Sequence, residues 1–265
     1  MTHEEQRLWL IEKLKAGNPG YSKIPVPEDE QGQKDLLRML MNVRMPAPLG
    51  REFLEIQDAY LRRENLMRGI VGSKTIPSCE ANSRLAIWQG DITRLSVDAI
   101  TNAANSGMTG CYIPLHNCID NCIHSAAGLE LRQYCADMMR KQGYEEPTGQ
   151  AKITPGFNLP AKYVIHTVGP IVEYGVLKDE HRRLLRSSYL SCLELAAENG
   201  LESIAFCCIS TGVFMFPAKE AAKIAVDTVR EYLDANPDGS IQKVIFNVFS
   251  DRDRGIYEGL LSADH

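Results

Sequence analysis

The sequence lacks any apolar run that approaches the ~20 residues needed to cross a bilayer. Its first residues, MTHEEQRLWLIEKLK, do not resemble a secretory signal. It also lacks an excess of positive charge, because 29 Lys and Arg face 34 Asp and Glu and the formal net charge is −5. We therefore expect no membrane partner and no non-specific binding of nucleic acid. The chain has no internal repeat and no low-complexity segment.

The composition that remains is typical of an ordinary soluble globular protein, with 44% hydrophobic and 24% charged residues in a chain of 265. The eight cysteines lie in a long chain whose first residues do not resemble a secretory signal, which argues against a disulfide framework. Cys192, Cys207 and Cys208 lie in apolar runs and are interpreted as small core residues. A reducing, cytoplasmic compartment is therefore expected.

Residues 1–80 differ from the rest of the chain. Apolar residues recur at helical spacing around Trp9, around Leu36 and through Arg51–Ile70, and prolines separate these stretches. This pattern predicts a helical N-terminal extension of three helices that ends in a linker over Gly72–Asn82. No motif in the extension points to chemistry, so packing or substrate docking is the role we expect.

Residues 81–265 alternate between apolar runs and amphipathic segments. Strands are predicted at 85–88, 97–101, 150–153, 163–167, 203–209 and 244–249. Helices are predicted at 119–141, 179–199, 217–233 and 253–261. Apolar strands that alternate with helices are typical of a three-layer α/β/α fold around a mixed, largely parallel sheet. We therefore predict one α/β domain over residues 81–265.

The chemistry is concentrated in residues 102–128, NAANSGMTGCYIPLHNCIDNCIHSAAG, between a predicted strand and a predicted helix. Such loops are where open α/β sheets bind ligands. Two thiols and an imidazole suited to zinc lie here: Cys111, His116 and Cys118. Three protein ligands would leave a coordination position open, and a fourth would close the site. Cys122 is the candidate fourth ligand, but it falls on the apolar face of its helix and is interpreted as a core residue. His124 and His166 are interpreted as structural.

Six sequence blocks lie in a fixed order between residues 85 and 261. They are GDIT (90–93), VDAITNAAN (97–105), IDNCIHSAAG (119–128), PTGQAKITPGFNLPAKYVIHTVGP (147–170), ISTGVFMFP (209–217) and FSDRDRGIY (249–257). Together they resemble the macrodomain, the ADP-ribose-binding fold, over roughly two thirds of the chain. The insert CYIPLHNC (111–118) resembles the zinc-dependent branch of bacteria and fungi, because most macrodomains carry a glycine-rich turn there.

The resemblance implies a zinc-dependent hydrolase, with one Zn²⁺ ion, that removes mono-ADP-ribose from modified protein side chains. Two alternatives stay open: a non-catalytic ADP-ribose reader in which zinc only braces the loop, and an O-acetyl-ADP-ribose deacetylase. The implied partner is an ADP-ribosylated protein, with ADP-ribose as product. A lipoyl-carrier protein resembling glycine-cleavage H is the candidate substrate that the resemblance suggests.

The resemblance also assigns residues to parts of ADP-ribose. It places the adenine amino group at Asp91 and the backbone of Ile92, with Phe249 near the adenine. From the residues alone, Asp91 could equally cap a short helical turn with Thr93. Small residues before a helix let backbone N–H groups face an anion, and the resemblance assigns the diphosphate to such a loop: Ser210, Thr211, Gly212, Val213 and Phe214. Met215 stands where glycine is more usual in the family.

Asn105 and Asp120 are the expected catalytic residues. The NAAN block assigns Asn105 to the distal ribose hydroxyls, where an amide can donate and accept at once; holding a turn is the other interpretation. Asp120 lies in the first turn of a helix, where the macrodipole stabilises a carboxylate. By resemblance, Asp120 orients or deprotonates a water near the anomeric carbon. The zinc would polarise either a ribose hydroxyl or that water.

Overall fold

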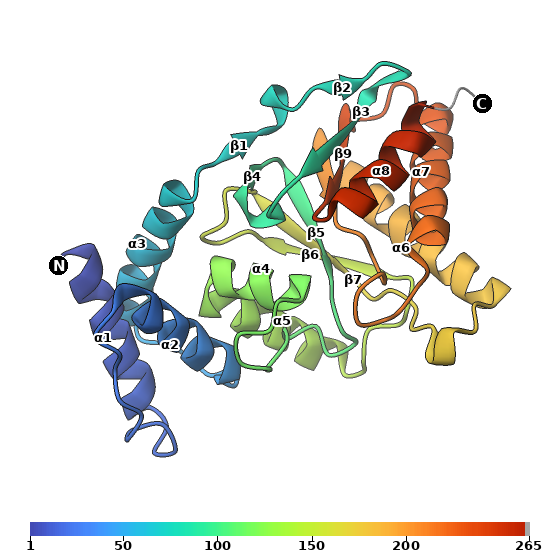
Figure 1. The fold of residues 1–265 in the computed structure, drawn as a ribbon. Helices are drawn as coiled ribbons and strands as arrows, with labels where there is room; N and C mark the ends of the chain where they lie inside the picture. The colour runs from blue at the N-terminus through green and yellow to red at the C-terminus, as the bar shows by residue number, and fades with distance from the viewer. Residues whose placement is uncertain (263–265) are drawn as a thin grey trace.

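The computed structural model describes residues 1–262, and a seven-stranded sheet lies at its centre (Figure 1). The strand order is β2 (Ser78–Cys79), β3 (Asn82–Gln89), β9 (Lys243–Val248), β8 (Ser203–Phe206), β5 (Ala99–Ala103), β7 (Tyr163–Thr167), β6 (Ala151–Pro155). The inner five strands are parallel, whereas β2 and β6 run antiparallel to their neighbours. The inner strands are apolar because both faces of a parallel sheet are covered by helices.

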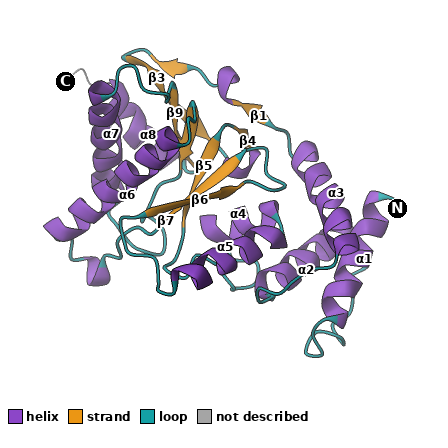
Figure 2. Ribbon diagram, turned by 180° about the vertical axis from the view of Figure 1, so that it is seen from behind, coloured by secondary structure: helices purple, strands orange, loops and turns teal. Residues whose placement is uncertain are grey.

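Helices cover both faces of the sheet. One layer contains α4 (Ile119–Ala127) and α5 (Leu129–Gln142), and the other contains α6 (Asp179–Glu198), α7 (Ala218–Ala235) and α8 (Asp251–Ser262) (Figures 1 and 2). A short parallel pair, β1 (Val71–Gly72) with β4 (Leu95–Ser96), lies apart from the main sheet. The predicted three-layer α/β/α fold with a mixed sheet and preceding helices is confirmed. Within residues 1–262, no helix is both long and apolar enough to cross a membrane.

The N-terminal extension forms three helices, α1 (His3–Ala16), α2 (Glu30–Val43) and α3 (Arg51–Met67). Thr2 and Glu5 form a capping box at the start of α1, and Asp29 caps α2. The three helices share an apolar core of their own, which reaches the sheet domain at Leu129. Figure 1 shows the extension beside α4 and α5, far from α7.

Two local predictions differ from the structure. The helix predicted at 119–141 is broken at Gly128, whose φ of 98° is left-handed, and a Cβ there would meet Gln57 of α3 at 2.8 Å. Part of the predicted linker, Ser78–Cys79, is strand β2 and pairs with β3 at the sheet edge. The division of the chain at residue 80 stays a prediction.

Candidate active site and metal centre

The predicted site residues follow four neighbouring parallel strands. Asp91 comes after β3, Phe249 after β9, the phosphate loop (residues 209–217) after β8, and Asn105 after β5. Because the four strands are parallel, their carboxyl ends meet at one edge of the sheet. The structure therefore brings these residues to one edge, in the order Asp91, Phe249, phosphate loop, Asn105.

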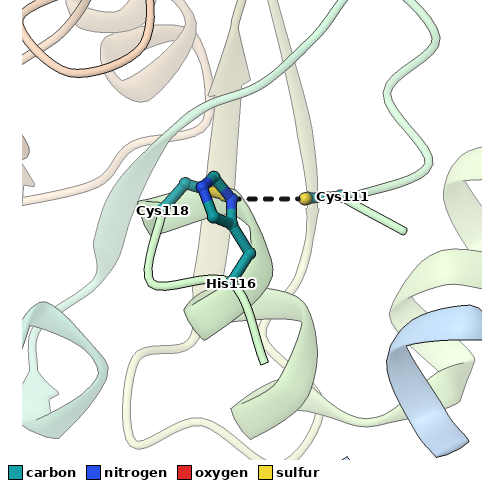
Figure 3. A group of neighbouring side chains, drawn as sticks. All are labelled: Cys111, His116 and Cys118. Carbon is teal, nitrogen blue, oxygen red and sulfur yellow. Dashed lines mark hydrogen bonds between the residues drawn. The ribbon is translucent and has the colours of Figure 1, made fainter. Parts of the chain in front are cut away.

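The metal loop (residues 111–118) lies between β5 and α4. The ligand atoms of Cys111, His116 and Cys118 all lie within 4.8 Å of one another. Cys111 Sγ and His116 Nδ1 are 3.5 Å apart (Figure 3). Tetrahedral zinc, with Zn–S of about 2.3 Å and Zn–N of about 2.0 Å, separates sulfur and nitrogen by about 3.5 Å. The donor set and its spacing therefore fit a zinc ion.

The protonation of Cys118 depends on whether a cation is bound beside it. Cys118 caps the N-terminus of α4, where its Sγ accepts a hydrogen bond from the N–H of Asn121. Burial raises the pKa of the Cys118 thiol, and the neighbouring Cys111 raises it further. The Cys118 thiol thus stays protonated unless a cation stabilises its thiolate, which a bound metal does.

Cys122 lies outside the group of three ligands. The prediction that it is a core residue is wrong, because its side chain is only partly buried and Arg38 Nη2 lies 3.8 Å from its Sγ. A guanidinium beside the sulfur makes Cys122 a poor fourth ligand for a dication. Three protein ligands are therefore what the described residues offer.

Asp120 is buried beside the metal loop, in the first turn of α4. Asn102 Nδ2 donates to its Oδ1 at 2.8 Å, and Asn105 Nδ2 lies 3.3 Å from its Oδ2. Burial raises the pKa of Asp120 to about 6, against the lowering effect of the Asn102 hydrogen bond and of Arg132. Two amides therefore orient a carboxylate that exchanges protons close to neutral pH in the absence of a metal.

Asn105 holds a turn as well as contacting Asp120. Its Oδ1 accepts from the N–H of Gly107 at 3.0 Å, and its Nδ2 donates to the carbonyl of Gly110 at 3.2 Å. The amide therefore ties the end of β5 to the start of the metal loop. Its assignment to ribose hydroxyls stays a prediction.

At the other end of the edge, Asp91 caps a 3₁₀ turn, as the sequence allowed. Its Oδ1 accepts from the N–H and the hydroxyl of Thr93, and its Oδ2 accepts from Arg68 Nη1 at 3.1 Å. The side chain is about one third exposed. Ile92 is buried, whereas Phe249 is 80% exposed. An exposed aromatic ring at the sheet edge is available to a ligand.

The phosphate loop has a left-handed backbone at two residues, Ser210 (φ 65°) and Met215 (φ 58°). Met215 therefore occupies a conformation that glycine adopts without strain. Among residues 1–262, no group accepts from the backbone N–H of Gly212, Val213 or Phe214. These N–H groups lie just before α7, where an anion is stabilised by free amides and by the helix dipole.

A second group of possible ligands, His124, Cys135 and His166, is fully buried beneath Asp120. Both ring nitrogens of His166 are already engaged, by Asn102 at 3.1 Å and by Thr154 at 2.9 Å. Burial lowers the pKa of His166 to about 3, so the ring is neutral. His166 therefore fits its predicted structural role, because a metal would have to displace both hydrogen bonds. Neither ring nitrogen of His124 has a hydrogen-bond partner among the described residues, so the same prediction is not confirmed for His124.

Comparison with known proteins identifies the family. Residues 101–225 match the family model of the Macro domain. Over 264 residues the sequence is 56% identical to a protein-ADP-ribose hydrolase of Treponema medium, covering 99% of this chain and 100% of that protein. The chain belongs to the Macro domain family.

Two further comparisons describe this macrodomain. A protein-ADP-ribose hydrolase of Staphylococcus aureus (strain MRSA252) is 44% identical over 256 residues, covering 97% of this chain and 95% of the relative. The crystal structure of a Trypanosoma brucei macrodomain in complex with ADP-ribose matches with a TM-score of 0.66 and 29% identity, covering 84% of this chain and 95% of that one. The Treponema medium relative, which covers 99% of this chain, thus spans the extension as well as the sheet domain.

Four residues that hold the site of this macrodomain protein in place were not predicted from the sequence. Asn102 orients Asp120, and Arg38, Asn42 and Arg132 bond to the metal loop or to the helix beside it. One signal was present for Asn102, an amide within a fully buried part of strand β5. Arg132 likewise lies on the buried face of α5. Neither pattern predicts which residue the polar side chain contacts.

Proposed function

We propose that this macrodomain is a zinc-dependent hydrolase that removes mono-ADP-ribose from modified protein side chains. The observation that carries the proposal is the order of groups along the sheet edge. The adenine candidate Asp91, the free amides of the phosphate loop, and the ribose candidate Asn105 follow the order of the parts of ADP-ribose. Asp120 and the metal loop then lie at the end where the bond to protein would be. The two relatives named protein-ADP-ribose hydrolase support the same activity.

In the proposed reaction, the chain binds the adenosine and the diphosphate far from the bond that breaks. Asp91 accepts from the adenine amino group, with Ile92 and Phe249 beside the ring, and the amides of the phosphate loop donate to the diphosphate. Asn105 binds the hydroxyls of the distal ribose. These contacts fix the anomeric carbon beside Asp120.

Asp120 then acts on the attacking water. It orients the water and accepts its proton as the oxygen bonds to the anomeric carbon. The bond from that carbon to the protein side chain breaks, and its electron pair and a proton go to the side chain. The products are ADP-ribose and the unmodified protein.

Cys111, His116 and Cys118 would hold the zinc ion. The bound ion would supply a Lewis acid with an open position, able to polarise a ribose hydroxyl or a water. The chain's own contribution is to keep three ligands converged beside Asp120. Ile113 and Leu115 of the metal loop are exposed, which gives an ADP-ribosylated protein an apolar surface beside the reacting bond.

The natural partner and the compartment belong to the same proposal. We take the substrate to be an ADP-ribosylated protein, with a lipoyl-carrier protein resembling glycine-cleavage H as the first to test, in the cytoplasm. A metal site built from thiolates needs reduced cysteines, and the cytoplasm keeps cysteines reduced.

The test combines elemental analysis for zinc with turnover assays on two substrates. We expect about one zinc ion per chain, release of ADP-ribose from a mono-ADP-ribosylated protein, and far slower turnover of O-acetyl-ADP-ribose. A protein that binds ADP-ribose but turns over neither substrate is a reader. Faster turnover of O-acetyl-ADP-ribose would make it a deacetylase instead.

A further inference from the structure

Helix α2 of the extension contacts the metal loop through Arg38. Arg38 Nη2 donates to the carbonyl of His116 at 2.7 Å and to Asn121 Oδ1 at 3.0 Å. Asn121 in turn donates to the carbonyl of Ile113 at 3.0 Å. One guanidinium therefore fixes the backbone of a metal ligand and, through Asn121, the middle of the loop.

Asn42, one helical turn further along α2, holds the next part of the loop. Its Oδ1 accepts from the N–H of Leu115 at 3.0 Å, and its Nδ2 donates to Ser125 Oγ of α4 at 2.9 Å. Leu115 has a φ of 55°, a left-handed conformation that leucine rarely adopts. The buried amide therefore stabilises a backbone conformation that this residue would not keep unaided.

Arg132 of α5 ties the same loop to the end of α2. Its Nη1 donates to three carbonyls there, of Met41, Asn42 and Arg44, at 2.7–3.0 Å. Its Nη2 lies 3.4 Å from the carbonyl of Cys111, and its guanidinium stacks over the ring of Tyr112. The last turn of α2 and the first turn of the loop thus share one buried cation.

The contacts of α2 with the metal loop differ from the contacts by which α3 packs on the sheet domain. On α3, Gln57 Oε1 accepts from the N–H of Leu129, and Asn65 donates to the carbonyl of Asn158. Those bonds, together with the extension's own apolar core, attach the helices to the sheet domain without touching the metal loop. On α2, Asn42 is buried and Arg38 is partly buried, and hydrogen bonds to the metal loop and to α4 offset the cost of burying these polar groups.

We propose that the extension is a positioning module for the metal centre: Arg38 and Asn42 hold the metal loop in its ligand-presenting conformation before zinc binds. The inference rests on the proposed zinc site and assigns a role to helix α2. A loop that is already ordered loses less conformational freedom when the metal binds, so its affinity for zinc is higher. Groups that orient metal ligands from outside typically change metal affinity by roughly 10–100-fold when removed.

The test measures the zinc affinity of Arg38→Ala in the full-length protein, by competition with a chromophoric chelator. We expect the zinc dissociation constant to rise by roughly 10–100-fold. The absorption spectrum of the Co²⁺-substituted protein should shift, because the His116 backbone is no longer fixed. The ADP-ribose dissociation constant of the zinc-free protein should stay within about twofold of the wild type, because the contacts assigned to adenine and diphosphate lie along other strands.

Gln57→Ala is the matched control, because it removes a hydrogen bond of 2.9 Å between the extension and the sheet domain without touching the metal loop. Its zinc affinity should equal that of the wild type. An equal loss in Gln57→Ala, or an unchanged zinc affinity in Arg38→Ala, would overturn the inference. Should Arg38→Ala fail to fold, Arg38→Lys decides: a weakened zinc affinity supports the positioning role, and wild-type affinity overturns it. A wild-type protein that binds no zinc would instead overturn the proposed zinc dependence.

Discussion

The metal loop and the phosphate loop both follow a parallel strand of the sheet, but they are held in different ways. The metal loop takes its main polar partners from distant helices, through Arg38, Asn42 and Arg132. The phosphate loop is closed mostly by its own backbone, with Met215 N–H bonded to Gly212 and Phe216 N–H bonded to Ser210. One loop is therefore built by tertiary contacts and the other largely by local conformation.

The two loops also offer different chemistry. The metal loop presents thiols, an imidazole and the buried carboxylate of Asp120. The phosphate loop presents free backbone amides, which bind an anion but neither donate nor accept a proton in a reaction at neutral pH. Substitutions in the metal loop should therefore reduce catalysis more than ADP-ribose binding, and substitutions in the phosphate loop should reduce binding.

The largest effect is expected for Cys118→Ser, which removes one of the three proposed metal ligands. Hydrolysis of an ADP-ribosylated protein should fall below detection, because serine presents a neutral hydroxyl, which binds zinc much more weakly than a thiolate does. Binding of ADP-ribose, followed by thermal shift, should largely remain. Cys122→Ser is the matched control and should keep both zinc and activity. Full hydrolysis by folded, metal-free Cys118→Ser would show that the metal takes no part in the reaction.

Asp120→Ala should slow hydrolysis by about 10²–10⁴-fold, because the carboxylate that positions the water is lost. Single-turnover rates at saturating substrate report this step, and calorimetry reports ADP-ribose affinity. The dissociation constant should change far less than the rate. Comparable losses in the two quantities would make Asp120 a ligand of the ground state rather than a base.

Asp91→Ala tests the opposite end of the sheet edge. It should weaken ADP-ribose binding by roughly 1.5–3 kcal/mol, the value of a hydrogen bond to a charged acceptor. The zinc dissociation constant should not change, because Asp91 follows β3 whereas the metal loop follows β5. Asp91→Asn keeps an oxygen for the Thr93 cap and separates loss of the cap from loss of the charge. Unchanged affinity in calorimetry would leave Asp91 as a helix cap only.

The smallest effect is expected for Met215→Gly in the phosphate loop. The left-handed backbone costs a non-glycine residue about 1–2 kcal/mol, and glycine's extra freedom in the unfolded chain offsets about 0.5–1 kcal/mol of the gain. Urea unfolding should therefore show a free energy of unfolding higher by about 0–1.5 kcal/mol. Val213→Gly, which is exposed in the same loop without a left-handed φ, should lower stability instead. A clear loss of stability in Met215→Gly would mean that the side chain, and not the backbone, holds the loop.

The sequence predicted the elements that depend on local patterns. Strands β8 and β9 are mostly apolar because both faces of a parallel sheet are buried. The spacing of Cys111, His116 and Cys118 indicated a metal site because three ligands within eight residues are close enough along the chain to bind one ion. The break at Gly128 was missed, since helical periodicity continues on both sides of it and the side chains that a Cβ there would meet, Gln57 and Asn158, are distant in the sequence.

What only the tertiary structure decided is which distant side chain meets which. Periodicity shows that a face is buried, but not what covers it, so nothing in the sequence pairs Arg38 with His116 across 78 positions. The same holds for Arg68, which meets Asp91 from the end of α3. Long-range polar pairs depend on how complete helices dock, and docking is set by the summed burial of many apolar side chains rather than by any local motif.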